Sequence, residues 1–296
     1  MSKTPQNFVI AIVGPTAIGK TALSIKLAQH FNSEIISADS RQFFKEMAIG
    51  TAVPSKEELS AAPHHFIQHK SIKEYFSVGD FEREAISKIN DLHQKHPIVV
   101  MVGGSGLYVK AVTKGLDYFP EVDANIRENL NLQLENSGLI PLQEQLKTLD
   151  LEAYNTIAID NPQRVIRALE ICIGTAKPYS SFLTNSEKNR EFKTISIGLS
   201  ADRSMIYDRI NQRVDIMIAN GLLEEAKSLL PYKDLNALNT VGYKELFAYF
   251  EGESTLEFAI SEIKKTQDAL QKDNLLGLEK TTQLLGSIMR LTLKPS

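Results

Sequence analysis

The stretch G-P-T-A-I-G-K-T at residues 14–21 follows the apolar run F-V-I-A-I-V at residues 8–13 and leads into a helical pattern over residues 20–31. The spacing G-x-x-x-x-G-K-[ST] between a strand and a helix defines a P-loop. Its backbone N–H groups, the Lys20 ammonium and the helix N-terminus attract an anion, and the Thr21 hydroxyl is a ligand for Mg²⁺. We therefore expect a diphosphate group, on a substrate that the loop alone does not specify, to bind Gly14, Pro15, Thr16, Ala17, Ile18, Gly19, Lys20 and Thr21.

The bulk composition excludes several classes of protein. The 296 residues are 43% hydrophobic, which suits one large domain or two smaller ones, and the net charge of −3 does not indicate a nucleic-acid binder. The single cysteine, Cys172, excludes a disulfide framework and a cysteine-rich zinc site. There is neither a signal-peptide pattern nor a run of 18 apolar residues, so we expect a cytoplasmic protein without a membrane contact.

The first hundred residues alternate between strand and helix patterns. Strands are predicted at 8–13, 34–38 and 97–102, and helices at 20–31 and 79–94. Short connections between alternating elements indicate a parallel, doubly wound sheet. Ligands of such sheets bind beyond the carboxyl ends of the strands. The residues that follow the three strands, including Gly14, Asp39 and Gly103, are therefore expected on one rim.

Helical patterns alone fill the next segment, at 123–136, 139–148, 150–157 and 162–174. A strand pattern returns at 191–200, and helices are predicted after it at 203–219, 222–230, 241–250 and 255–265. The predicted fold is thus an α/β, P-loop-type parallel sheet flanked by helices, formed by residues 1–116 and 191–265. An all-helical insertion domain spans residues 117–190.

Polar residues follow two of the predicted strands. Asp39-Ser40-Arg41-Gln42 comes after strand 34–38, where a carboxylate can accept a proton, hold a metal ion or cap a helix. Gln42 has the donor–acceptor pair that recognises an adenine edge. Strand 97–102 runs into G-G-S-G at 103–106. An ATP-hydrolysing P-loop enzyme carries an acidic residue for Mg²⁺ at this position, and here there is none. The absence of the acidic residue favours a second glycine turn in which Ser105 contacts the diphosphate.

Three further groups leave their interpretation open at this point. Arg164 and Arg167 share one face of a helix that Asn161 caps, and that face either binds a ligand or is simply solvated. On helix 203–219, Arg213 is either an ion-pair partner or a clamp on the diphosphate. His64-His65 lacks a third metal ligand, so we expect a structural role for this pair.

Taken together, the motifs resemble those of the bacterial tRNA dimethylallyltransferases (tRNA isopentenyltransferases), over roughly residues 8–265. Besides the P-loop, the matching stretches are S-A-D-S-R-Q at 37–42, I-G-T-A-V-P at 49–54, H-H-F at 64–66, V-G-D-F at 78–81, G-G-S-G-L-Y-V-K-A at 103–111, N-P-Q-R-V-I-R-A-L-E at 161–170, R-V-D-x-M at 213–217, G-L-x-x-E at 221–225 and T-V-G-Y-K-E-L at 240–246.

The resemblance implies transfer of a dimethylallyl group from dimethylallyl diphosphate to N6 of the adenosine 3′ of the anticodon in tRNAs. It implies Asp39 as the base that accepts the amine proton, with Ser105 and Arg213 completing the diphosphate cage and Mg²⁺ held at Thr21. It further implies a monomer that contacts the anticodon stem-loop through Asp39, Ser40, Arg41, Gln42, Ser105, Arg127, Gln163, Arg164, Val165, Ile166 and Arg167.

Other functions stay open from the residues alone. A small-molecule or nucleoside kinase would use the P-loop but lacks the acidic residue at the strand end. An adenylate isopentenyltransferase would act on free nucleotides, whereas the long insertion with Gln163 and Arg164 favours tRNA. A non-catalytic RNA-binding protein would bind tRNA without prenyl transfer.

The C-terminal tail, residues 266–296, departs from the family pattern. Residues 266–280 read T-Q-D-A-L-Q-K-D-N-L-L-G-L-E-K, where the family carries a basic, aromatic stretch. Regrouping the permitted codons by one base gives N-T-R-R-F-A-K-R-Q-F-T-W-F-R-K, with six basic residues and no acidic one. We therefore hypothesise a shift of reading frame near Lys265, with a weaker grip on RNA phosphates as its consequence. A divergent helical C-terminus is the alternative.

Overall fold

The chain is described by a computed structural model that covers residues 6–184, 188–267 and 288–293. It divides into two compact units. The first consists of Met1–Lys114 and Asn189–Ser296, and the second of Gly115–Lys188. The sequence patterns placed the helical insertion at 117–190, two residues further along at each end. Among the described residues, no helix combines the length and the apolar character that crossing a membrane requires.

The first unit is built on a parallel sheet with the strand order β3-β2-β4-β1-β5-β6. This confirms the predicted P-loop-type fold, and the two strands that the sequence patterns missed, β3 and β6, lie at its edges. The strands are β1 (Asn7–Val13), β2 (Ile35–Ser37), β3 (His64–His65), β4 (Ile98–Val102), β5 (Phe192–Ala201) and β6 (Ile288–Leu293).

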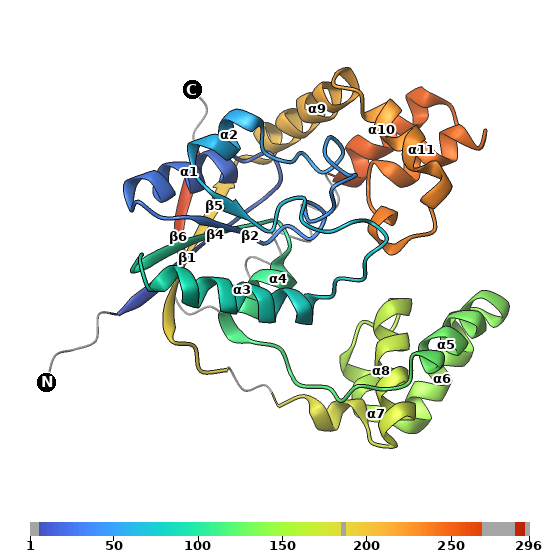
Figure 1. The fold of residues 1–296 in the computed structure, drawn as a ribbon. Helices are drawn as coiled ribbons and strands as arrows, with labels where there is room; N and C mark the ends of the chain where they lie inside the picture. The colour runs from blue at the N-terminus through green and yellow to red at the C-terminus, as the bar shows by residue number, and fades with distance from the viewer. Residues whose placement is uncertain (1–5, 185–187, 268–287, 294–296) are drawn as a thin grey trace, which may run out of the picture. The chain divides into compact units, whose positions relative to one another are not determined.

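Both faces of the sheet are covered by helices, as Figure 1 shows. On one face lie α1 (Lys20–His30) and α2 (Lys56–Ala61), and on the other α3 (Val78–His93) and α4 (Gly106–Lys114). Successive residues of β1 serve the two faces in turn: Val9 and Ala11 pack with α3 and α4, whereas Ile10 and Ile12 pack with α1. A strand that is buried on both faces reads as the continuous apolar run seen at residues 8–13.

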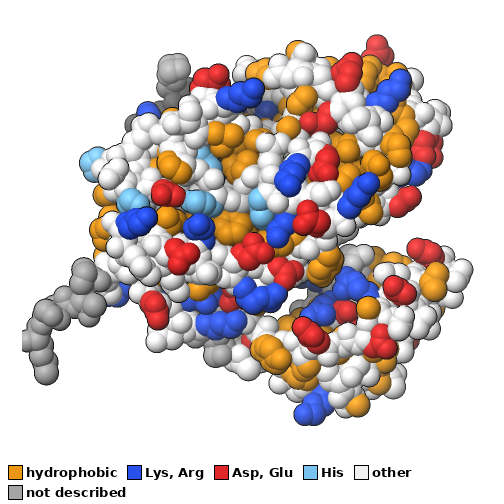
Figure 2. Space-filling view, in the orientation of Figure 1, with side chains coloured by type: hydrophobic (Ala, Val, Ile, Leu, Met, Phe, Trp, Pro, Cys, Tyr) orange, Lys and Arg blue, Asp and Glu red, His pale blue; other side chains and the backbone are white. Residues whose placement is uncertain are grey.

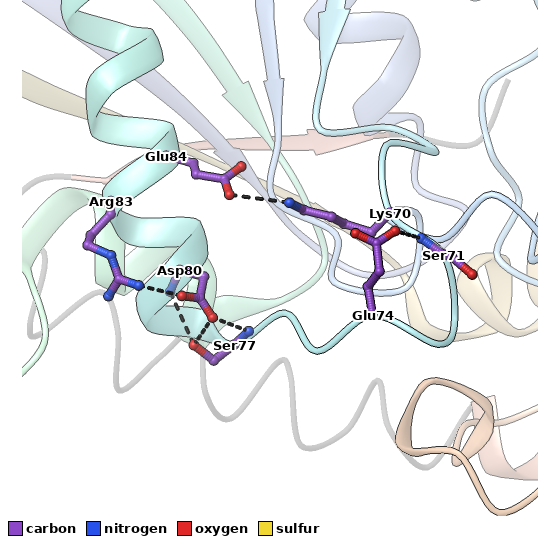
Figure 3. Close-up of polar contacts among 7 residues, drawn as sticks. All are labelled: Lys70, Ser71, Glu74, Ser77, Asp80, Arg83 and Glu84. Atoms are coloured by element: carbon purple, nitrogen blue, oxygen red, sulfur yellow. Dashed lines mark hydrogen bonds and ion pairs between the residues drawn. The ribbon is translucent and has the colours of Figure 1, made fainter. Parts of the chain in front are cut away.

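The segment that leads into α3 is held by polar contacts of its own (Figure 3). The Ser77 hydroxyl accepts the Asp80 N–H at 3.1 Å, and the Asp80 carboxylate accepts the Ser77 N–H at 2.9 Å. This reciprocal capping box fixes the start of the helix at Val78, because it satisfies N–H groups that the first turn leaves free. Lys70 Nζ lies 3.3 Å from Glu84 Oε1, which ties the preceding loop to the same helix.

Helices from the C-terminal half form a separate apolar core within the first unit. Val214, Leu222 and Tyr243 are buried there together with Phe44 and Met47 of the loop that follows β2. The helices are α9 (Arg203–Ala219), α10 (Leu222–Leu229) and α11 (Tyr243–Phe250), with short 3₁₀ turns at Leu230–Tyr232 and Asn236–Leu238 and a last helix over residues 256–267. All four helices were predicted within two residues of these bounds.

All regular secondary structure in the described part of the second unit is helical. Leu130, Leu142, Ala153 and Leu169, one from each α-helix, meet in a single core that contains no residue of the sheet. The elements are α5 (Ala124–Ser137), α6 (Leu139–Leu149), α7 (Leu151–Thr156) and α8 (Pro162–Thr175), followed by the 3₁₀ turn η1 (Tyr179–Phe182).

The C-terminal tail is described only in part. The last helix continues through residues 266–267, and β6 at Ile288–Leu293 pairs in parallel with β5. The basic, aromatic stretch proposed for the shifted reading frame corresponds to residues 266–280, most of which lie outside the described residues. The hypothesis of a frame shift therefore stays a prediction.

Candidate functional site

A pocket of about 290 Å³ opens at the carboxyl ends of β1, β2 and β4 in the first unit. Residues 16–22 of the P-loop and α1 form one part of its wall, and Asp39 and Arg213 form another. The complete wall consists of Thr16, Ala17, Ile18, Gly19, Lys20, Thr21, Ala22, Ser37, Asp39, Gln42, Ala52, Pro54, Glu58, His64, Ile67, Val102, Gly103, Gly104 and Arg213. The structure thus brings the predicted phosphate loop, base and clamp together.

The P-loop presents positive charge to this pocket. Helix α1 begins at Lys20 without a side-chain cap and without an acidic residue in its first turn, so its N–H groups are open to an anion. Lys20 Nζ donates to the carbonyl oxygens of Gly14 at 2.8 Å and Pro15 at 2.6 Å. An ammonium group has three donors, so one remains for a ligand.

The two cations of the pocket are partly buried. Burial lowers the pKa of Lys20 to about 8, with the neighbouring Arg213 adding to the decrease and Asp39 opposing it. Burial also lowers the pKa of Arg213, again against the effect of Asp39. The Nε atom of Arg213 is buried and has no hydrogen-bond partner in the described structure. Cations that are desolvated but not fully paired form a site that an anion stabilises.

Asp39 lies in a turn after β2 that fixes its carboxylate. Its Oδ1 accepts the Arg41 N–H at 3.2 Å, and its carbonyl oxygen accepts the Gln42 N–H at 3.1 Å. Helix capping, the alternative role considered for this residue, does not apply, because residues 40–43 form a turn and not a helix. Oδ2 makes no hydrogen bond within the described residues and is available to a substrate proton.

The glycine turn after β4 approaches the end of β2 closely. A Cβ atom on Gly103 would lie 2.3 Å from the carbonyl oxygen of Ala38, so only glycine fits there. Ser105, which we expected to touch the diphosphate, does not line the pocket. Its hydroxyl oxygen accepts the Ser40 N–H at 3.1 Å and lies 3.1 Å from Ser40 Oγ. Ser105 therefore joins the two rim loops.

The remaining acidic and histidine side chains do not assemble a metal cluster. Among the residues that the structure describes, no three His, Cys, Asp or Glu side chains are grouped to hold a metal ion. His65 Nε2 pairs with Glu34 Oε2 at 2.5 Å, a structural contact as expected. Mg²⁺ needs few protein ligands when substrate phosphates supply the others, so Thr21 and Asp39 in the same pocket fit this ion.

Residues 42–273 match the family model described as IPP transferase. The chain belongs to this family. A tRNA dimethylallyltransferase of Christiangramia forsetii is 63% identical over 278 residues, which cover 94% of this chain and 92% of the relative. The tRNA dimethylallyltransferase of Flavobacterium johnsoniae is 60% identical, with 93% and 91% covered. The chain is accordingly an enzyme of the prenyltransferase class.

Solved structures of other IPP transferases have the same fold. The crystal structure of the tRNA isopentenylpyrophosphate transferase from Bacillus halodurans matches with a TM-score of 0.70 and 36% identity, over 97% of this chain and 90% of that one. A eukaryotic dimethylallyltransferase acting on tRNA matches with a TM-score of 0.79 and 27% identity, over 97% of this chain and 74% of that one.

In this IPP transferase, Arg41 and Gln42 both bond to the protein itself. Arg41 donates to the carbonyl oxygens of Asn236 and Ala237, each at 2.9 Å, and of Asn239 at 3.2 Å. Gln42 Nε2 donates to the carbonyl oxygens of residues 51 and 52 at 3.1 Å and 3.0 Å. Gln42 also lines the pocket, but its amide nitrogen is bonded to the loop at residues 51–52. Recognition of an adenine edge by Gln42 stays a prediction.

The expected tRNA-binding run on α8 needs a correction. Val165 and Ile166 have 0% exposure and belong to the core of the helical unit, so their side chains cannot contact RNA. Gln163 and Arg164 are exposed, and Arg167 is half-buried. Helical periodicity explains the difference, because positions adjacent in sequence point to different sides of the helix.

Arg127 and Arg167 of the helical unit share one acidic partner. Their guanidinium groups lie 3.0 Å and 2.9 Å from Glu170 Oε2, and Arg127 also donates to Gln163 Oε1 at 3.2 Å. On the face shown in Figure 2, basic and acidic side chains are interspersed. Binding of RNA to this chain therefore cannot rest on its bulk charge.

Several pocket residues were not identified from sequence. Glu58 lines the pocket although no role was assigned to it, and His64 lines it although we expected only a structural role for that residue. Helix α2, which carries Glu58, has no buried residue and hence no apolar stripe, but its capping box with Ser55 was readable as S-x-x-E. Helix α4 was missed because the glycines before it indicated a loop. Its buried residues Val109 and Val112 were the available signal.

Proposed function

We propose that this enzyme transfers a dimethylallyl group from dimethylallyl diphosphate to N6 of the adenosine 3′ of the anticodon in tRNA, with release of diphosphate. One observation carries the proposal: Lys20 of the P-loop, Arg213 of α9 and the Asp39 carboxylate line one pocket, whereas the strand end at Gly103 and Gly104 has no acidic residue. The pocket is thus suited to a diphosphate leaving group and a proton acceptor. Membership of the family supports the same reaction.

The diphosphate would lie against the N-terminus of α1, with the third donor of Lys20 and the guanidinium of Arg213 directed to it. Negative charge builds on the leaving oxygen as the carbon–oxygen bond breaks. Buried cations stabilise that charge more than solvated ones do, because water does not screen them. Mg²⁺ would be held by the Thr21 hydroxyl together with the diphosphate, to which it would supply further positive charge.

Asp39 would act at the nucleophile. The adenine N6 attacks the allylic carbon, a carbon–nitrogen bond forms, and the electron pair of the broken bond leaves with the diphosphate. The amine then carries an extra proton, which Asp39 Oδ2 accepts. The Arg41 N–H at Oδ1 holds the carboxylate in place and orients it for this role.

Each unit offers residues of its own to the anticodon stem-loop. In the first unit, Ser40 lies in sequence between the pocket residues Asp39 and Gln42, and in the second, Gln163, Arg164 and Arg127 would contact the RNA backbone. An adenine reaches a pocket of this kind only when it is splayed out of the loop.

The test compares two donors and two acceptors. Calorimetry should detect binding of dimethylallyl diphosphate with Mg²⁺. Diphosphate release should then depend on an anticodon stem-loop that carries adenosine, with the same loop carrying guanosine as the control. Turnover of ATP without prenyl transfer would instead identify a kinase. RNA binding without turnover of either donor would identify a non-catalytic RNA-binding protein.

A further inference from the structure

A carboxylate outside the pocket holds the loop that forms part of its wall. Glu225 on α10 accepts the backbone N–H groups of Ala48 at 3.0 Å and Ile49 at 2.8 Å through Oε2, and that of Gly50 at 2.9 Å through Oε1. The Tyr243 hydroxyl donates to the same Oε1 at 2.7 Å. Four donors thus converge on one side chain, and three of them belong to a loop that lies 175 to 177 positions away along the chain.

The arrangement around Tyr243 leaves the loop little freedom. Tyr243 is fully buried, and a Cβ atom on Gly50 would lie 2.7 Å from its ring. Glycine is therefore required at position 50 by close approach. Burial and the contact with Glu225 raise the pKa of the Tyr243 hydroxyl, so it stays protonated and remains a donor.

Hydrogen bonds connect the loop that Glu225 holds, residues 48–53, to the wall of the pocket. Within the loop, Ala52 N donates to Ile49 O and Val53 N donates to Ala48 O, both at 3.0 Å. The carbonyl oxygens of Thr51 and Ala52 accept the two hydrogen bonds that Gln42 Nε2 donates. Gln42, Ala52 and Pro54 all line the pocket. An unbroken series of hydrogen bonds therefore runs from Glu225 to the pocket wall.

This wall differs in character from the P-loop. Ala52, Pro54 and Ile67 are apolar, whereas the P-loop end of the pocket carries Lys20 and Thr21. A substrate with a charged diphosphate and an apolar five-carbon group would place the latter against the apolar wall. The two ends of the pocket are also built from separate segments, residues 14–21 and residues 47–54.

We propose that Glu225 is a positioning residue that sets the pocket wall of Gln42, Ala52 and Pro54 and thereby aligns the prenyl group for transfer. The proposal rests on the proposed prenyl transfer. Glu225 itself does not touch the pocket and acts through the 48–52 loop.

The first experiment does not depend on activity. In Glu225→Gln, the amide NH₂ faces backbone N–H groups or the Tyr243 hydroxyl, so part of the set of four hydrogen bonds is lost. Hydrogen exchange of a peptide covering residues 44–54 should become at least about tenfold faster. Glu224→Gln, on the same helix and exposed, removes the same charge and should leave the exchange unchanged. Unchanged exchange in Glu225→Gln would overturn the proposal.

The second experiment separates the two ends of the pocket. Glu225→Gln and Gly50→Ala should each lower kcat/KM for prenyl transfer by up to about 10²-fold, because a misplacement of about 1 Å has effects of this size. Gly50→Ala moves the loop without changing any charge. Binding of inorganic diphosphate with Mg²⁺ should stay within about twofold of wild type in both variants, since the P-loop is not displaced. Loss of diphosphate binding would identify general unfolding and overturn the proposal.

A double-mutant cycle tests the route of the effect. Gln42→Met removes the amide that links the loop to the pocket, so in combination with Glu225→Gln the effects on kcat/KM should be clearly less than additive. Full additivity would show that Glu225 does not act through Gln42. If wild type itself shows no prenyl transfer while the exchange result holds, the proposed function fails and the loop anchor stands.

Discussion

The pocket of the first unit and helices α5 and α8 of the second each place two cations beside one carboxylate, but only the second set is joined by ion pairs. In the pocket, Asp39 raises the pKa of Lys20 and of Arg213 against the effect of burial, and it forms no ion pair with either among the described contacts. In the helical unit, Arg127 and Arg167 are paired directly with Glu170, and their side chains are 39% and 42% exposed. The cations of the pocket are therefore open to an anion, whereas those of the helical unit are already half neutralised by Glu170.

This difference in ion pairing indicates which of the two sites can bind a phosphate group tightly. A desolvated cation without an acidic partner has lost the stabilisation that water gives to its charge, and an incoming diphosphate replaces that stabilisation. A half-exposed arginine on a carboxylate has water and a partner, so a phosphate must compete with both. We expect tight, specific anion binding in the pocket and weak, salt-sensitive RNA contact at the arginines of the helical unit.

The largest effect should come from the carboxylate of the pocket. Asp39→Asn keeps the shape but removes the proton acceptor, so prenyl transfer should fall by about 10²–10⁴-fold. Binding of the tRNA anticodon stem-loop should be nearly unchanged, which a filter-binding titration checks. The matched variant in the helical unit, Glu170→Gln, should leave kcat close to wild type. Wild-type rates in Asp39→Asn would remove this residue from the mechanism.

A smaller effect should come from the titration of Lys20, whose pKa is about 8. The charged form binds the anion, so the affinity for inorganic diphosphate should be constant well below pH 8 and fall by up to about tenfold per pH unit above it. Asp39 raises the pKa of Lys20, and Asp39→Asn should therefore move the decline to lower pH. Ionisation of diphosphate itself is common to both proteins. Identical profiles, measured by calorimetry, would contradict the coupling of the two groups.

The smallest effects should come from α8. Arg164 is exposed and makes no side-chain hydrogen bond within the described residues, whereas Arg167 is tied to Glu170 and lies 5.3 Å from the centre of the Phe119 ring. Arg164→Ala should lower the slope of log affinity for tRNA against log salt by about one unit, and Arg167→Ala by less. Equal slopes in both variants and in wild type would mean that this helix face is only solvated.

Much of the fold could be read from local patterns. The buried run at residues 8–13 and the stripe of Phe81, Ala85 and Ile89 on α3 predicted their elements, since burial on both faces or on one stripe leaves a direct trace in the sequence. Elements with little burial left no such trace. Helix α2 buries no residue, and β3 has two residues, so periodicity could not reveal either.

Among the site residues, too, some could be predicted from local sequence and others could not. The P-loop is local, because one strand, one loop and one helix supply its anion-binding groups within residues 14–21, and the sequence by itself determined it. Asp39 could be proposed because parallel strands end at a common rim. These predictions needed only chain direction and residue type.

Tertiary structure alone decided what distant side chains do. Nothing local assigned Gln42 and Arg41 to loops at residues 51–52 and 236–239, or Glu225 to the N–H groups of residues 48–50. Hydrogen bonds between segments far apart in sequence depend on how the chain brings them together, and a polar side chain has the same identity whether it meets a ligand or the protein's own backbone.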